Sequence, residues 1–399
     1  MKKKILILSA VFPPEPVVSA SISEALADEF SRQGEQVVVV CPRPTRPLNF
    51  QFDAEFEPSA YRLVRLNSYT YPASGFLGRM RESYSFGTHC VAYIASHAHE
   101  LKGIYANTWP LPAQLLSVRA ARKHRVPIVL HIQDVYPEAI LGKLPFFRSL
   151  IRAVLLPFDR YILKQATHVV TISEKMKSYL VNTRQLDASN VSVVCNWQDE
   201  TVFMAGEQTE AQAERPFTLM YLGNIGPVAG LETVIEAFAL TGLDDARLVI
   251  AGSGSMKEAL KQQAANTPEL AIEFWPVPDG QVAHTQAQGD VMLLPVKKGA
   301  ALSSIPSKLP AYLFSSKPVI ASVDEDSDTA RAVEESGCGW VVAPESAVAL
   351  SRVIRQAAAT IKVLLKEKGD RGFRYAMTHF SKKTNLPRLV QIIKNTFNQ

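Results

Sequence analysis

The sequence lacks three features that would assign a protein class at once: a strong charge surplus, paired cysteines and a long apolar run. Its formal net charge over 399 residues is +5, which does not favour nucleic acid as the main partner. The four cysteines are far apart without a Cys-x-x-Cys pair, which is typical of reduced thiols in a cytosolic protein and not of a disulfide or zinc framework. No stretch approaches the roughly 20 uninterrupted apolar residues that a transmembrane helix needs. We therefore expect a cytoplasmic protein, soluble or peripheral to a membrane.

The N-terminus imitates a signal peptide. Lys2–Lys4 is basic and the run 5–12 that follows is apolar. That run is short, however, and it ends at Pro13 and Pro14 without a small-x-small cleavage site. A buried first β-strand stopped by prolines fits this pattern better.

Short apolar runs rich in β-branched residues recur along the chain and alternate with helical spacing. Because 47% of the residues are hydrophobic and 20% are charged, the chain has enough apolar material for sizeable cores and is not disordered. Strands buried on both faces have this composition, and their alternation with helices predicts parallel βαβ units. The runs lie at 5–9, 37–41, 127–132, 168–172, 191–195, 217–222, 247–251, 291–295, 318–322 and 340–343. The expected fold class is a doubly wound α/β protein.

The pattern starts twice, once at the N-terminus and again at Phe217, just after the polar stretch 206–215. At roughly 150 residues per domain, the length allows two or three domains. We predict two Rossmann-like parallel-sheet domains that face each other across a cleft, an acceptor domain over 1–205 and a donor domain over 206–375. A last helix in 376–399 is expected to pack back on the first domain.

The dinucleotide fingerprint is absent from both starts: neither has Gly-x-Gly-x-x-Gly with an acidic residue about 20 positions on. A nicotinamide or flavin enzyme is therefore disfavoured. Open parallel sheets nevertheless bind ligands beyond the carboxyl ends of their strands, where helix N-termini supply free N–H groups. The loops that follow the strands are therefore the candidate sites.

Three loops of the second half combine small residues at such strand ends. The glycines in 223–230 let a ligand approach the backbone closely. The Gly-Ser-Gly-Ser of 252–255 does the same, although Ser255 as a helix N-cap is an alternative explanation. In the third loop, the helix start at Ser307 and the charge of Lys308 favour an anion. The alternative there is an ordinary capped helix with a solvated lysine.

In this order the motifs resemble those of the retaining glycosyltransferases of family 4, which have the GT-B architecture. The second half carries the resemblance in its glycine loop 217–230, its Gly-x-Gly strand 248–255 and its Pro-Val strand 317–321. In the first half, Phe12–Glu15 resembles the usual opening of the family. The segment 132–138 is similar to the Asp-x-x-Pro-Glu of members that act in polysaccharide and O-antigen assembly.

The resemblance implies a metal-independent transferase that moves a hexose or N-acetylhexosamine from a nucleotide-sugar, with a UDP-sugar as the expected donor. The implied acceptor is a glycan or polyprenyl-linked molecule in cell-surface polysaccharide or lipopolysaccharide assembly, with no cofactor and no nucleic acid. The implied donor-binding residues are Gly223, Asn224, Gly226, Gly252, Ser253, Gly254, Val277, Ser303, Ser304, Ile305, Pro306 and Ser307. The implied acceptor-binding residues are Pro13, Pro14, Glu15 and Tyr136.

Two side chains are candidates for catalysis. Lys308 would meet the negative charge that builds up on the leaving diphosphate. Asp134, at the carboxyl end of the strand 127–132, would orient or deprotonate the acceptor hydroxyl. Its alternative role is to order the turn before Pro137. His131 is expected to be a packed core histidine.

The sequence also departs from the family pattern. Most members carry a Glu-x7-Glu pair, and those positions fall here near Ser303 and Ala311, neither of which is acidic. Asn224 and Ala229 stand where basic residues are common. Two alternatives therefore stay open: a nucleotide-sugar epimerase of similar architecture and a non-catalytic subunit with the same fold.

Two charged segments have interpretations of their own. The segment 142–165 is basic and amphipathic, which is typical of helices on anionic membranes, although a core-facing helix would look similar. Asp324–Asp326 imitates the Asp-x-Asp metal motif of another glycosyltransferase architecture. Because it sits among further acids, a solvated acidic loop is the better interpretation, and we expect no metal site.

Overall fold

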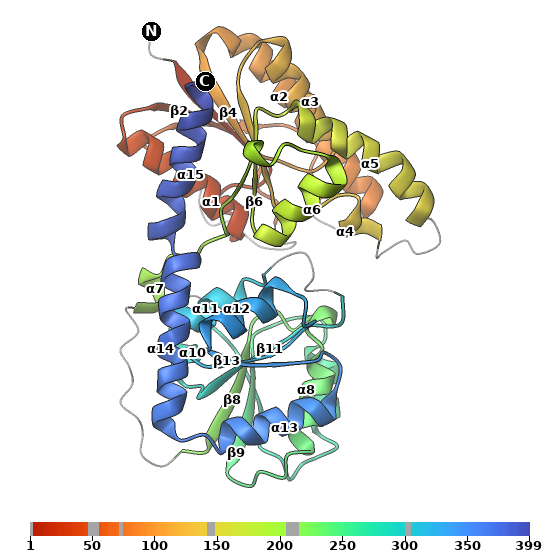
Figure 1. Ribbon diagram of the computed structural model, residues 1–399, viewed down its shortest axis with the longest axis vertical. Coiled ribbons are helices and arrows are strands. Elements are labelled where there is room, and N and C mark those ends of the chain that lie inside the picture. Colours follow the sequence, from red (N-terminus) through yellow and green to blue (C-terminus); the bar gives the residue numbers. More distant parts are fainter. Residues whose placement is uncertain are drawn as a thin grey trace. The chain divides into compact units, whose positions relative to one another are not determined.

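The computed structural model describes residues 3–46, 56–71, 75–141, 148–204, 215–278, 280–299 and 305–399, and the chain divides into two compact units. Unit 1 comprises Met1–Asn196 and Asn385–Gln399, and unit 2 comprises Trp197–Thr384. Each unit contains one parallel sheet with helices between its strands (Figure 1). The expected fold class, two doubly wound parallel-sheet domains, is confirmed. Most of the polar stretch 206–215 lies outside the described residues, and the expected cleft stays a prediction.

Unit 1 is built on a seven-stranded sheet in the order β3-β2-β1-β4-β5-β6-β7. Its strands are β1 (Lys4–Ser9), β2 (Gln36–Pro42), β3 (Arg62–Leu66), β4 (Leu101–Asn107), β5 (Ile128–Ile132), β6 (His168–Thr171) and β7 (Val191–Val193). The apolar side chains of β1 are fully buried because helices cover both faces of the sheet. The chain order reverses between β1 and β4, so the loops after these strands diverge and leave a crevice at their carboxyl ends.

The helices of unit 1 follow the strands they connect. They are α1 (Val18–Arg32), α2 (Phe76–His97), η1 (Ala98–Glu100), α3 (Pro112–Lys123), α4 (Glu138–Leu141), α5 (Arg148–Gln165), α6 (Glu174–Arg184) and η3 (Ala188–Asn190). Helices α2 and α3 pack against each other over one face of the sheet, as Figure 1 shows.

The last helix, α15 (Lys382–Phe397), belongs to unit 1 from Asn385 onward. Leu389 and Ile393 on its inner face are fully buried. A Cβ atom at Gly103 in β4 would overlap the ring of Phe397, so the glycine allows the helix end to approach the strand closely.

Unit 2 has a six-stranded sheet in the order β10-β9-β8-β11-β12-β13. Its strands are β8 (Phe217–Leu222), β9 (Ala246–Ala251), β10 (Ile272–Trp275), β11 (Val291–Pro295), β12 (Val319–Ser322) and β13 (Gly339–Val342). Its helices are α7 (Thr201–Met204), η4 (Pro227–Ala229), α8 (Leu231–Ala239), α9 (Lys257–Ala264), α10 (Val282–Ala287), α11 (Lys308–Phe314), α12 (Asp328–Ser336), α13 (Ala347–Ala358) and α14 (Lys362–His379). Here the order reverses between β8 and β11, so the loop after β8 lies at the switch point.

Two strands of unit 1 have no counterpart among the expected apolar runs. The sequence of β3 alternates arginine with apolar residues, and β4 contains Lys102, Gly103 and Asn107. Neither looks like a continuous apolar run, because β3 is an edge strand and the end of β4 is polar. Among the described residues, no helix is both long and apolar enough to cross a membrane.

Candidate functional site

In unit 2 the first two glycine-rich loops of the predicted site lie against each other. The Ile225 N–H donates to the Ser253 carbonyl at 2.8 Å, and the Gly223 N–H donates to the Ala251 carbonyl at 3.0 Å. Gly252 has a φ of +129°, and a Cβ atom there would overlap the Gly223 carbonyl oxygen. The glycine is therefore required for this contact of backbone on backbone, which leaves a floor made of peptide groups.

Lys308 crosses the end of β8 next to this floor. A Cβ atom at Gly223 would overlap its Cε, and its Nζ lies 5.2 Å from the centre of the Tyr221 ring. Burial lowers the pKa of Lys308. No carboxylate in the described ranges forms an ion pair with it, so its charge faces the glycine loops uncompensated.

Tyr312 fixes the position of Lys308. Its hydroxyl accepts the Leu222 N–H at 3.0 Å and donates to the Leu222 carbonyl at 2.9 Å. Because Tyr312 is fully buried and lies one turn after Lys308 on α11, it ties that helix to the last residue of β8. The lysine therefore stands on a short, well-anchored helix.

The structure brings together a large part of the predicted donor set. Gly223, Asn224, Gly226, Gly252, Ser253, Gly254 and Lys308 are joined by the contacts above or are their direct neighbours. The Gly252 N–H also donates to the Trp275 carbonyl at 3.0 Å, which brings the end of β10, just before Val277, beside the second loop. Ile305, Pro306 and Ser307 lead into α11, and Ser303 and Ser304 lie outside the described residues. The donor-binding roles stay predictions.

The acidic loop 324–326 has a structural contact. Glu325 and Asp326 are exposed, and the Asp324 carboxylate accepts the Gly299 N–H at 2.7 Å. In the part of the chain that the structure describes, no three His, Cys, Asp or Glu side chains are grouped as metal ligands. Through this hydrogen bond to Gly299, Asp324 anchors the segment that leads into the third loop.

In unit 1 a cavity of about 110 Å³ opens at the carboxyl ends of β1, β4 and β5. Its walls include Asn107, Thr108 and Trp109 after β4, and Gln133 and Asp134 after β5. This is the crevice expected where the strand order reverses. Of the predicted acceptor-side residues, Asp134 lines it.

A chain of polar side chains forms one wall of this cavity. Asn196 donates its amide N–H to Gln133 Oε1 at 2.8 Å, and Gln133 Nε2 lies 3.3 Å from His131 Nε2. His131 Nδ1 and the Tyr105 hydroxyl are 2.6 Å apart. Burial lowers the pKa of His131 to about 3, so the ring is neutral and Nε2 accepts while Nδ1–H donates. His131 is the buried histidine that the sequence predicts, and it is not a base at neutral pH.

The other predicted acceptor residues have contacts within unit 1. The Glu15 side chain is buried, and its Oε1 accepts the N–H groups of Thr45 at 2.8 Å and Arg46 at 2.9 Å. The Pro13 carbonyl accepts from Arg65. Burial raises the pKa of Tyr136, and the nearby Asp134 raises it further. The acceptor-binding roles of Pro13, Pro14, Glu15 and Tyr136 stay predictions.

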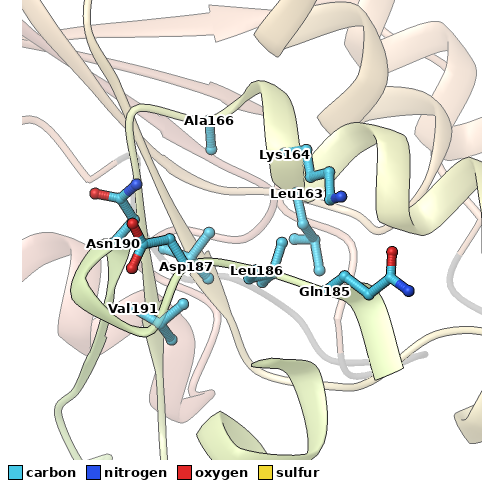
Figure 2. A pocket seen from close by; sticks show the side chains of 9 residues that line it. Leu163, Lys164, Ala166, Gln185, Leu186, Asp187, Asn190 and Val191 are labelled. Atoms are coloured by element: carbon cyan, nitrogen blue, oxygen red, sulfur yellow. The ribbon is translucent and has the colours of Figure 1, made fainter. Parts of the chain in front are cut away.

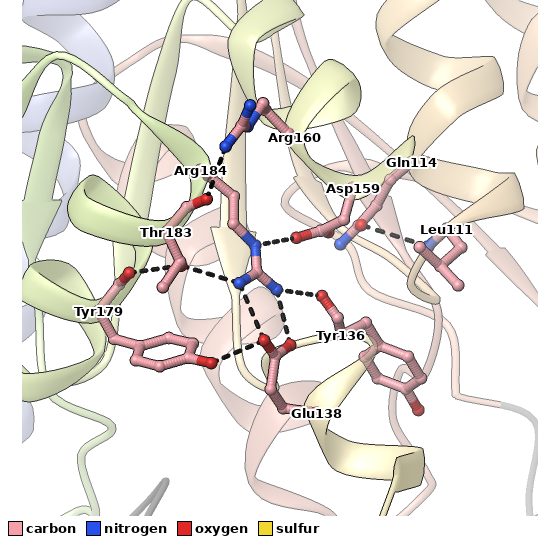
Figure 3. A network of polar contacts seen from close by, with 9 residues as sticks. All are labelled: Leu111, Gln114, Tyr136, Glu138, Asp159, Arg160, Tyr179, Thr183 and Arg184. Atoms are coloured by element: carbon pink, nitrogen blue, oxygen red, sulfur yellow. Dashed lines mark hydrogen bonds and ion pairs between the residues drawn. The ribbon is translucent and has the colours of Figure 1, made fainter. Parts of the chain in front are cut away.

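A buried guanidinium holds the loop that carries Asp134. Arg184 is fully buried, and its Nη2 donates to the Tyr136 carbonyl at 2.5 Å and to Glu138 Oε2 at 2.6 Å. Its Nε donates to Asp159 Oδ2 at 2.8 Å, so α4, α5 and α6 meet at one side chain, as Figure 3 shows. Asp134 therefore stands on a loop whose far end is fixed by a buried ion-pair network.

The two carboxylates of this network differ in their pKa. Glu138 accepts two N–H groups from Arg184 and the Tyr179 hydroxyl, and these hydrogen bonds overcome burial and hold its pKa below the usual value. Asp159 accepts one, and burial raises its pKa to about 6. One guanidinium stabilises one buried anion well and the second poorly.

A second cavity, of about 280 Å³, lies elsewhere in unit 1. Figure 2 shows side chains from the end of α5 and the loop after α6 around it, among them Leu163, Lys164 and Leu186. Val169 and Val191 place it at the amino ends of β6 and β7. Because ligands of doubly wound sheets bind at the opposite edge, the smaller cavity beside Asp134 is the better candidate for chemistry.

Sequence reasoning missed the residues that position the site. Tyr312 and Arg184 have no motif of their own, and most of their partners lie far away in the sequence; Gln133 lies in the segment 132–138, but its contact with Asn196 is equally distant. In the sequence, these residues are marked only as polar residues next to a predicted strand end or helix. The glycine motifs, in contrast, could be recognised from the sequence by their order.

Both halves of the chain match family models of glycosyltransferases. Residues 19–197 match the Glycosyl transferase 4-like domain, and residues 206–362 match Glycosyl transferases group 1. The chain is 25% identical over 240 residues to the probable glycosyltransferase WbjE of Pseudomonas aeruginosa, over 57% of this chain and 58% of the relative. It is 25% identical over 378 residues to the putative colanic acid biosynthesis glycosyl transferase WcaI of Escherichia coli (strain K12), over 89% and 92%. The first match thus spans little more than half of its relative.

Solved structures of similar fold cover the whole chain. Sucrose-phosphate synthase from Thermosynechococcus elongatus superposes with a TM-score of 0.75 at 17% identity, over 100% of both chains. Anabaena Alr3699/HepE in complex with UDP gives 0.68 at 16% identity, over 99% of this chain and 100% of that one. At such identities the likeness shows the fold alone.

The pKa of Asp159 generates a prediction about stability. Because the folded state holds this proton up to about pH 6 and an unfolded Asp loses it near its usual value of 3.8, the ionised form costs stability. The contribution of Asp159 to the free energy of unfolding should therefore fall by about 1 kcal/mol per pH unit between pH 4 and 6. In Asp159→Asn this pH dependence is absent. The free energy of unfolding of the variant should therefore rise relative to that of the wild type as the pH rises. Urea unfolding from pH 4 to 7 measures the difference, and parallel curves for the two proteins would contradict it.

Proposed function

Because this chain belongs to the glycosyltransferases that join a 4-like domain to a group 1 domain, we propose that it transfers a sugar from a nucleotide-sugar to a glycan or polyprenyl-linked acceptor. We infer a reaction that retains the anomeric configuration, in the assembly of cell-surface polysaccharide. The name of the relative WcaI, which refers to colanic acid, supports this pathway class. The observation that carries the proposal is Lys308, which has no ion pair among the described residues and lies beside Gly223 of the first glycine loop.

The donor is a UDP-sugar in this proposal, with hexose or N-acetylhexosamine as the sugar. The structural neighbour HepE binds UDP, which supports the nucleotide. Transfer leaves negative charge on the departing diphosphate, and fixed donors aimed at that charge lower the barrier. Lys308 supplies such a donor, and the reaction that we propose uses no metal ion and no cofactor.

The acceptor binds in the cavity of unit 1. Asp134 is exposed at its rim and carries the carboxylate that orients the attacking hydroxyl and takes up its proton. His131 forms part of the wall and stays neutral. The buried Arg184 network gives the Asp134 loop the fixed geometry that bond formation needs.

We further propose peripheral contact with the inner face of the plasma membrane through α5. Leu150 and Val154 on this helix are 63% and 62% exposed, and Phe158 and Tyr161 are exposed on the following turns. These spacings of four, four and three place the side chains on one helix face. Arg152 is exposed on the same helix but lies two residues from both Leu150 and Val154, on the opposite side of the helix. Residues 142–147 of the predicted amphipathic segment lie outside the described residues.

The first experiment tests donor binding. Lys308→Met removes the cation with little change in size, and we expect UDP to bind about 10- to 100-fold more weakly, since a hydrogen bond to a charged group contributes about 1.5–3 kcal/mol. Lys298→Met is the matched control because Lys298 is an exposed lysine outside the glycine floor. Isothermal titration calorimetry measures both. A folded wild type that binds no nucleoside diphosphate would refute the proposed function.

The second experiment tests Asp134. We expect Asp134→Asn to lower kcat of sugar transfer about 10²- to 10⁴-fold, because the amide cannot take up the hydroxyl proton. The affinity for UDP should stay at the wild-type value, since Asp134 belongs to unit 1. Product analysis with donor alone separates the rivals: an epimerase releases a changed free sugar without acceptor. A non-catalytic subunit is indifferent to both Lys308 and Asp134 substitutions.

The third experiment tests the membrane face. We expect Leu150→Ser with Val154→Ser to bind vesicles of phosphatidylcholine and phosphatidylglycerol about tenfold more weakly, because two apolar side chains no longer enter the interface. Val363→Ser is the control, since Val363 is 64% exposed on α14 of the other unit. Vesicle co-sedimentation measures the binding. An equal loss in all variants would count against α5 as the contact.

A further inference from the structure

Near the carboxyl end of β4, three buried hydrogen-bond donors have no partner within the described part of the chain. They are Thr108 Oγ1, the Trp109 indole Nε1 and Arg46 Nε, and each lacks a hydrogen bond to the residues that the structure describes. Thr108 is 9% exposed and the Arg46 side chain 12% exposed, so water satisfies them poorly. An unpaired buried donor is costly, and several at one place indicate a site that a ligand completes.

Positive charge gathers at the same place. The guanidinium carbon of Arg46 lies 4.5 Å from the centre of the Trp109 ring, and that of Arg79 lies 5.4 Å from it. Both arginines share one carboxylate, Glu82, which is 1% exposed: Arg46 is 2.7 Å from it and Arg79 3.4 Å. Two cations with one anion between them leave a net positive charge. Burial and then the charge of Arg46 lower the pKa of Arg79, as expected for cations held together.

The acid Glu15 is bound to the backbone and not to the arginine side chains. Its Oε1 accepts the backbone N–H groups of Thr45 and Arg46, and among the described residues it forms no ion pair with Arg46 or Arg79. The atoms at this place that lack a partner among the described residues are N–H groups of Arg46 and Trp109 and the Thr108 hydroxyl, all of which can donate. A neutral sugar needs acceptors as well as donors for its hydroxyls, whereas an anion with several oxygens needs donors alone.

The cluster adjoins the candidate acceptor cavity. Thr108 and Trp109 line the same cavity as Asp134. Burial raises the pKa of Tyr136, Asp134 raises it further and Arg79 opposes this, so both charges act on the same phenol. A group bound by the arginines would therefore lie close to the carboxylate that we assign to the acceptor hydroxyl.

We propose that Arg46, Arg79, Thr108 and Trp109 form a subsite that binds a phosphate group of the acceptor beside Asp134. The inference rests on the proposed function, because it names the acceptor class of the same cavity. A guanidinium pair offers the planar, forked donors that suit phosphate oxygens, and the indole N–H and threonine hydroxyl complete the shell. The subsite thus selects phosphorylated acceptors over neutral glycans.

Pyrophosphate binding tests the subsite without knowledge of the acceptor. The experiment uses the full chain with Lys308→Met, so that the candidate donor site is disabled, and titrates inorganic pyrophosphate by calorimetry. We expect one remaining site, weakened about 10- to 100-fold by Arg79→Gln. Trp109→Phe keeps the ring under the arginines but removes the N–H, and a several-fold loss is expected. Arg81→Gln is the matched control, since Arg81 lies on the same helix and stacks on Tyr69 instead.

Two results would overturn the subsite: no pyrophosphate bound by Lys308→Met, or the same affinity with and without Arg79→Gln. Both leave the proposed function intact if the wild type still binds UDP, and loss of UDP binding in a folded wild type would refute that function separately. The UDP affinity of Arg79→Gln should equal that of the wild type. Unchanged thermal unfolding of each variant shows that it is folded.

Vesicles identify the source of the phosphate. Phosphatidylcholine vesicles with and without a polyprenyl phosphate are compared for wild type, Arg79→Gln and Arg81→Gln. Retention on the phosphate-containing vesicles that Arg79→Gln alone abolishes assigns a lipid-linked phosphate. Pyrophosphate binding without such retention assigns a soluble phosphorylated acceptor. In turnover with phosphorylated and dephosphorylated forms of one acceptor, Arg79→Gln should raise KM about tenfold or more for the phosphorylated form only.

Discussion

Parallel strands buried on both faces leave a protein only one place for ligand chemistry, the edge where their carboxyl ends open into loops. The rest of this structure depends on that constraint, and each unit meets it at the strand pair where the chain order reverses. In unit 2 the loop after β8 is the glycine loop beneath Lys308. In unit 1 the loops after β1, β4 and β5 line the cavity that includes Asp134. Position in the sheet, more than the identity of any one residue, makes these two places the candidate sites.

The two units stabilise their loops by different means. Unit 2 uses close contact of backbone on backbone beside a lysine, which Gly223, Gly252 and Gly254 permit because they have no Cβ atom. Unit 1 uses buried charge: Arg184 fixes the loop after β5, and Glu82 lies between Arg46 and Arg79. A backbone floor suits a ligand defined by its phosphates.

The sequence could predict the parts that depend on local pattern. The apolar runs predicted most strands, and glycines at strand ends predicted the loops of unit 2. The apolar-run pattern did not predict strands β3 and β4, because Arg62, Arg65 and Lys102 interrupt their apolar residues. The networks around Arg184 and Tyr312 could not be predicted, since they join residues that are far apart in the chain and meet only after the sheets have formed.

Helix α15 makes unit 1 discontinuous, with its last segment after the whole of unit 2. The sheet of unit 1 is therefore synthesised before unit 2, whereas Phe397, which packs beside Gly103, and the buried Leu389 and Ile393 are synthesised after it. The first domain to be made is thus the last to be finished. The folding of the two domains is therefore coupled in time, although each has its own core.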